Sequence, residues 1–189
     1  SDKHDLRFGI YNGWNNIVDN NPQKSLAGEY TYTPSDRLLF NIVYFTGAER
    51  PPDAEVQGGW RHTVDSYVIA KPSPYVALLV RPVAGVEPTT VGTAWWLAGS
   101  LGVRIQVAKW MYLSSIGTLL REQQAGNDDS GFSSSVFYPT PWMATATGTA
   151  DFRPGDHLSL KLEYRHDQAG VPLYFAGDVA GEGTTDDPF

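Results

Sequence analysis

The stretch that decides the fold is His157 to Arg165, which reads HLSLKLEYR. Leucine or tyrosine occupies every second position, and serine, lysine, glutamate and arginine fill the positions between them. A β-strand places successive side chains on opposite faces, whereas a helix would bring Lys161 and Glu163 into the apolar stripe. The stretch therefore predicts a strand with one apolar face and one polar face.

The same period of two residues recurs along the chain. It is clear in five further segments, 6–11, 38–45, 61–69, 93–107 and 142–153, and more interrupted in three others, 26–33, 75–82 and 110–121. Together they predict nine strands. The apolar runs are far shorter than the roughly 18 residues that a transmembrane helix needs, so a membrane would have to be crossed by strands.

The predicted connections alternate between short and long. Short turns are expected near positions 34, 72, 108 and 154, three of them marked by proline. Longer connections rich in Gly, Asn, Asp and Pro are expected at 13–25, 46–59, 83–92 and 123–141. In an up-and-down sheet, all short turns then lie at one end and all long loops at the other. Outer-membrane barrels have this asymmetry.

Composition narrows the partners. The chain of 189 residues has 14 basic and 21 acidic residues and a net charge of −7, which argues against nucleic acid as a partner. The absence of cysteine excludes disulfides and thiolate metal sites. Aromatic residues make up 13% of the chain, and many fall near predicted strand ends. Those expected by the short turns are Tyr32, Tyr75, Trp110, Tyr112 and Phe152, and those expected toward the long loops are Tyr44, Trp60, Trp95, Trp96, Trp142 and Tyr164. We interpret them as two belts, one at each membrane–water interface, as is typical of barrels.

Motifs for catalysis or for metal binding are weak. The four histidines, His4, His62, His157 and His166, lack the spacing of a metal site, so no metal and no cofactor are expected. Ser159, His157 and Asp151 form a hydrolase trio only by composition, and we expect no enzyme. The acidic stretches 123–131 and 177–188 are expected to be solvated loops, with a divalent-cation site as the alternative.

The segment from Gly9 to Asn21 (GIYNGWNNIVDNN) resembles a motif of the OmpL-like outer-membrane β-barrel porins of Gram-negative bacteria. Leu26 to Leu38 (LAGEYTYTPSDRL), Arg61 to Asp65 and Leu160 to His166 resemble strands of the same family. The resemblance implies an all-β fold, an antiparallel up-and-down (meander) transmembrane β-barrel or part of one, with about nine or ten strands. Residues 1–189 would form a single β-barrel domain. We expect it to be incomplete at both ends, because family members carry strands before the first motif and close on a strand ending in an aromatic residue.

The resemblance also implies a function. We expect a porin of the bacterial outer membrane that allows passive diffusion of small polar solutes or ions, with lipid bilayer or detergent as a partner and a homo-oligomer as one alternative assembly. An arginine or lysine facing the bilayer midplane costs about 2–4 kcal/mol, so charged residues should face the lumen. The expected pore-lining residues are Arg7, Glu29, Asn41, Asp65, Arg81, Arg104, Asp151, Lys161, Glu163 and Arg165.

Two alternatives remain open at this point. In a structural outer-membrane barrel, the inward charges would pair with one another and plug the lumen, and binding would occur through the long loops. In a soluble or periplasmic β-barrel or sandwich that binds a ligand, the leucines would turn inward as a core and Lys161, Glu163 and Arg165 would face water. The direction of the leucines separates the second alternative from a membrane barrel.

Overall fold

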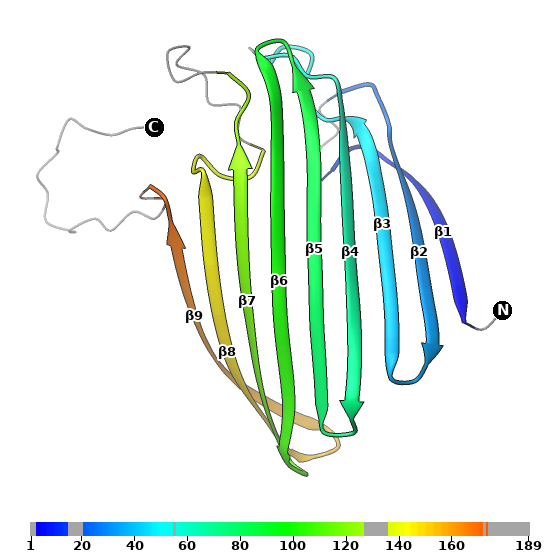
Figure 1. Ribbon diagram of the computed structural model, residues 1–189, viewed down its shortest axis with the longest axis vertical. Helices are drawn as coiled ribbons and strands as arrows, with labels where there is room; N and C mark the ends of the chain where they lie inside the picture. The colour runs from blue at the N-terminus through cyan, green and yellow to red at the C-terminus, as the bar shows by residue number, and fades with distance from the viewer. Residues whose placement is uncertain (1–2, 15–20, 55, 127–135, 172, 174–189) are drawn as a thin grey trace, which may run out of the picture.

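The computed structural model describes residues 3–14, 21–54, 56–126, 136–171 and 173. These residues form nine β-strands (Figure 1), as the alternation predicts. No helix among them is long and apolar enough to span a membrane. The strands are β1 His4–Tyr11, β2 Ser25–Ser35, β3 Leu38–Ala48, β4 Trp60–Ser73, β5 Val76–Thr89, β6 Gly92–Ala108, β7 Met111–Gln123, β8 Trp142–Gly155 and β9 Leu158–Ala169.

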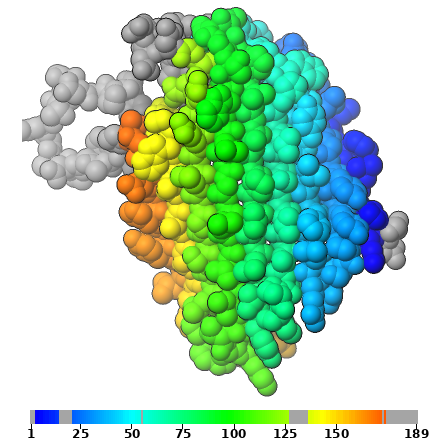
Figure 2. All heavy atoms as spheres, in the orientation of Figure 1, coloured from blue at the N-terminus to red at the C-terminus, as the bar shows by residue number. Residues whose placement is uncertain are grey.

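The strands form one antiparallel meander. Each strand pairs with the next along the chain, in the order β1 to β9. The predicted all-β meander fold is confirmed, but the sheet is not a closed barrel: within the described part of the chain, β1 and β9 are edges that pair with one strand each. The strands form a curved sheet that resembles part of a barrel wall (Figure 1). Their side chains pack into one continuous surface (Figure 2).

The four short turns lie where the sequence predicts them. They connect β2 to β3, β4 to β5, β6 to β7 and β8 to β9, and all lie at the same end of the sheet. The segments 12–24, 49–59 and 124–141 connect the strands at the opposite end. We call the two ends the turn end and the loop end.

The long loop predicted at 83–92 is wrong. Strands β5 and β6 continue through this segment, pairing Pro88 with Thr93, and only Thr90 and Val91 connect them. Proline lacks a backbone N–H and is tolerated in a strand only where no partner needs that group. Pro82 lies where the β4–β5 register has no paired residues, between Val80 and Val83, and Pro88 lies beyond the last of these pairs. The prolines therefore mark gaps in one ladder and not a loop.

Each strand has one apolar and one polar face. The register aligns apolar positions across neighbouring strands, as in the row Ile105, Leu113, Ala150 and Leu162. Large side chains on this face are exposed: Leu101 is 67% exposed and Leu162 is 72% exposed. The leucines of β9 do not form a core, contrary to the soluble alternative. Exposed apolar rows of this extent are expected where lipid is the solvent.

The polar face is the concave one. Trp14 follows β1 and Phe137 precedes β8, yet their ring centroids are 5.4 Å apart. Trp14 belongs to the segment between β1 and β2, and Phe137 belongs to the segment between β7 and β8. The nearest of these strands, β2 and β7, are five strand spacings apart, which is about 24 Å on a flat sheet at ~4.8 Å per strand. Both rings also contact Trp96, which lies on the polar face. The polar face is also the more buried one, since Asn41, Thr63 and Asp151 are buried, so the sheet curls (Figure 1) with its polar face inside.

We predict that a charge on the convex face destabilises the protein more than the same charge on the concave face. Leu101→Arg should lower the free energy of unfolding in lipid vesicles by about 2–4 kcal/mol. Thr118→Arg, on the concave face of the adjacent strand, is the matched control. It removes only the 2.9 Å hydrogen bond with Ser100, which costs about 1 kcal/mol. Denaturant titration measures both values, and equal losses would contradict the assignment of the faces.

Candidate functional site

The ten residues predicted to line a pore all lie on the concave face. Their positions alternate with the apolar rows within each strand, and the register between strands keeps them on one side. Arg7, for example, pairs with Glu29, and Asp151 pairs with Lys161. The other six lie at equivalent positions of β3 to β6 and β9: Asn41, Asp65, Arg81, Arg104, Glu163 and Arg165. Alternation alone was sufficient to place them on a common surface.

Most of these charges are paired along the wall. The Arg81 guanidinium donates two hydrogen bonds to the Asp65 carboxylate, and Arg165 donates one to Asp167 at 2.9 Å. Arg7 lies beside Asp5 and 3.7 Å from Glu29. Asn41 donates to Glu29 at 2.7 Å, and Glu163 accepts from Thr149 at 3.0 Å. These pairs join residues of the same or neighbouring strands, so they lie along the wall.

A second group of concave residues lies at the loop end. Glu87 has 0% exposure and is held by Arg50 and Arg61, each at 3.0 Å. A buried carboxylate is stable only when it is paired and hydrogen-bonded, and two guanidinium groups meet that need. The Arg61 guanidinium also lies over the rings of Trp14 and Trp96, 5.3 and 6.0 Å from their centroids. We call these five residues together with Phe137 the loop-end cluster.

Two further buried glutamates fasten loop segments to the sheet. Glu49 accepts hydrogen bonds from the Ser25 hydroxyl and from the Trp14 backbone N–H, both at 2.5 Å. Glu122 accepts from the backbone N–H groups of Val136, Phe137 and Tyr138. Hydrogen bonds to an ionised carboxylate are about twice as strong as neutral ones. The described parts of the loop segments therefore fold over the concave face at this end.

The loop-end cluster was not predicted from the sequence. Trp96 was predicted to lie in an aromatic belt, but its position in β6 alternates onto the polar face and its side chain is buried. Glu87 was assigned to the loop at 83–92, which the structure shows as strand. Continuing the alternation of 75–82 through both prolines would have placed Glu87 on the concave face. The belt assignment of Tyr112 is also wrong, because Tyr112 lies on the concave face beside two arginines. Tyr164 pairs with Gly148 in the middle of β9, away from the strand end.

A third group lies at the turn end and surrounds Asp151. This buried carboxylate accepts from Arg153 at 2.8 and 3.0 Å and from the Ser159 hydroxyl at 2.7 Å, and Arg104 approaches it at 3.5 Å. The guanidinium carbons of Arg104 and Arg153 lie 4.2 and 5.0 Å from the centre of the Tyr112 ring. Lys161 pairs with Asp151 in the β8–β9 register. We call these six residues the turn-end cluster.

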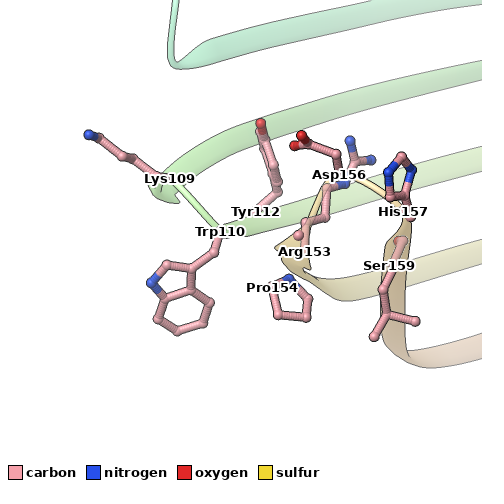
Figure 3. A pocket seen from close by; sticks show the side chains of 10 residues that line it. Lys109, Trp110, Tyr112, Arg153, Pro154, Asp156, His157 and Ser159 are labelled. Carbon is pink, nitrogen blue, oxygen red and sulfur yellow. The ribbon is translucent and has the colours of Figure 1, made fainter.

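A cavity of about 630 Å³ opens beside this cluster, between the β6–β7 and β8–β9 turns. Figure 3 shows Tyr112, Asp156 and His157 on one side of the strands, with Trp110 and Pro154 on the other. Ser159 also lines it, but its hydroxyl donates to Asp151. A serine nucleophile needs a neighbouring base to take its proton, and within the described chain no hydrogen bond joins Ser159 to His157. The three residues suggested by composition therefore lack the hydrogen bond from serine to histidine in this structure.

The remaining histidine and acidic-loop predictions have simple outcomes. His62 lies on the apolar face, where its Nδ1 is 2.7 Å from the Tyr44 hydroxyl and 2.9 Å from the Thr46 hydroxyl. Among the described residues, no group of three or more acidic or histidine side chains is arranged to hold a metal. Residues 127–131 and 177–188 of the predicted acidic loops lie outside the described residues.

We predict that Gly85→Ala disrupts the loop-end cluster. An added Cβ would lie 2.1 Å from Cζ2 of Trp96 and 2.8 Å from the backbone oxygen of His62, so the indole must move. Its fluorescence should shift to longer wavelength, and proteolysis within 49–59 should become faster. Gly99→Ala on β6 is the control, because its Cβ would meet nothing within 4 Å. Unchanged emission and proteolysis in Gly85→Ala would refute this account of the packing.

The comparisons with known proteins agree with this geometry. The model of the family described as "Putative beta-barrel porin-2, OmpL-like" matches residues 1–187. No curated protein and no solved structure matches the chain. The family match covers nearly the whole sequence, and the apolar convex face and charged concave face are those of a porin wall. The chain belongs to the OmpL-like beta-barrel porin family.

Proposed function

We propose that the concave face lines a water-filled passage in a bacterial outer membrane, through which small polar solutes or ions cross by passive diffusion. The observation that carries the proposal is the division of the sheet into an exposed apolar convex face and a charged concave face. Lipid would contact the first face and water the second. In a bilayer every backbone polar group must be hydrogen-bonded within the protein, and an antiparallel sheet meets this need along its interior strands.

The paired charges of the wall suit a passage for polar solutes. Arg81 and Asp65 are 50% and 29% exposed at their side chains, so both retain contact with water. Neighbouring charges of opposite sign create a field along the wall that solvates polar and ionic solutes without holding one sign strongly. Family membership supports the same role, and the outer membrane as its location, with bilayer lipid and small solutes as partners.

The loop-end cluster favours a second candidate, a structural barrel whose lumen is blocked. Its aromatic rings and the buried pairs of Glu87 lie over the concave face, where they would narrow a passage. A cluster that only narrows the passage leaves a measurable current, and a cluster that blocks it does not. Conductance across planar lipid bilayers therefore separates the two candidates. If the wild type is silent and Trp14→Ala conducts, the lumen is plugged by this cluster.

We predict that breaking the Arg81–Asp65 pair changes ion selectivity in opposite directions. Arg81→Gln leaves a carboxylate without its cation and should favour cations, whereas Asp65→Asn leaves the guanidinium and should favour anions. The reversal potential under a KCl gradient measures both shifts. Gly99→Ala, on the convex face, should leave it unchanged.

The channel proposal fails if the wild type gives no current above that of the lipid alone, and Trp14→Ala then shows whether the loop-end cluster is what blocks the lumen. It also fails if the wild type conducts but the Arg81→Gln and Asp65→Asn variants leave the reversal potential unchanged. In that case the current does not pass along the concave face.

A further inference from the structure

We propose that the turn-end cluster binds a small organic anion with an apolar body, such as an aromatic carboxylate. The inference rests on the proposed function, since it names a class of solute that the passage would hold. Three features of the structure carry it: an excess of cationic groups at the cluster, a cavity that gives access to it, and an apolar hollow on the same wall.

The cationic excess is a local departure from the rest of the wall. Arg81 and Arg165 each have a carboxylate of their own. At the turn end, Arg104, Arg153 and Lys161 surround the single carboxylate of Asp151. Glu163, the next acidic residue on this face of β9, accepts a hydrogen bond from Thr149. The acidic Asp156 lines the cavity together with Lys109 and His157.

Asp151 is already occupied by its other partners. Its Oδ2 accepts two hydrogen bonds from Arg153, and its Oδ1 accepts one from Ser159. Arg104 reaches the same Oδ2 only at 3.5 Å, with 44% of its side chain exposed. Guanidinium carries five N–H donors, so Arg104 keeps donors for a second anion. Lys161 forms no hydrogen bond or ion pair with the described residues and adds a further cation.

Tyr112 positions the two arginines. Both guanidinium groups lie against its ring, which holds them on the concave face near the 630 Å³ cavity. Cation–π contact of this kind restricts the motion of long side chains, so less entropy is lost when an anion binds. The paired N–H groups of arginine match the two oxygens of a carboxylate.

An apolar hollow of about 240 Å³ lies beside Arg104 on the same face. Ile69, Leu79 and Ile116 line it from one register row, and Arg104 and Ser114 line it from the next row toward the turns. Gly102 has no side chain to fill the space, and a Cβ there would come within 3.3 Å of Leu79. Ligand sites combine such apolar surface with a few polar groups that orient the ligand. The arrangement therefore fits an anionic head at Arg104 and an apolar body in the hollow.

The test measures the binding of benzoate to the full chain in lipid nanodiscs by saturation-transfer NMR. Acetate supplies the anionic head alone, and benzyl alcohol supplies the apolar body alone. Benzoate should bind about tenfold more tightly than either, since it makes both sets of contacts. Arg104→Gln should weaken benzoate binding by about tenfold, as expected when a hydrogen bond to a charged group is lost. Lys161→Met should weaken it in the same direction, and Arg81→Gln, on the same wall, should leave it unchanged.

Equal binding of benzoate to wild type, Arg104→Gln and Lys161→Met would overturn the inference. Acetate binding as tightly as benzoate would overturn the apolar subsite. The circular dichroism of each variant shows whether the sheet has formed. A protein that conducts ions but does not bind benzoate would refute this site and leave the proposed channel intact. A protein that binds benzoate through Arg104 but does not conduct would support the site and refute the channel.

Discussion

The structure depends on one constraint: its two faces require different solvents. An extended strand with alternating leucine and charge cannot bury both kinds of side chain in the same medium. Burying the charges in hydrocarbon costs several kcal/mol each, and exposing long apolar rows to water forfeits about 25 cal/mol for every Å² left unburied. A curved sheet with lipid outside and water inside avoids both costs. The curvature of the sheet and the position of the charges follow from this division.

The same constraint accounts for the difference between the two ends of the concave face. At the loop end, Glu49, Glu87 and Glu122 are buried, and each receives hydrogen bonds or ion pairs that bring loop residues over the sheet. At the turn end the connections are too short to fold inward, so Arg104 stays partly exposed and the cavity remains open. A solute entering from the loop end would therefore meet a covered wall first and a cationic site last.

The strands and their faces could be predicted from the sequence because alternation is a local signal. The nine strands and the common face of the ten predicted pore-lining residues follow from it, and the prolines mark three of the four short turns. The prediction failed at 83–92, where Pro88 lies within β5, because whether a proline interrupts a strand depends on the neighbouring ladder and not on the residue itself. It also failed to find the contact of Trp14 with Phe137, since the curvature of the sheet brings together segments that no local pattern relates.

The most direct test of the account is the accessibility of nitroxide labels placed one at a time at 160, 161, 162 and 163 of β9 in lipid bilayers. Oxygen concentrates in lipid, and a water-soluble nickel chelate does not enter it. Labels replacing Leu160 and Leu162 should collide with oxygen and be shielded from nickel, and labels replacing Lys161 and Glu163 should show the reverse. Leucine-site labels that are open to nickel and shielded from oxygen would contradict the assignment of lipid to the convex face and water to the concave face.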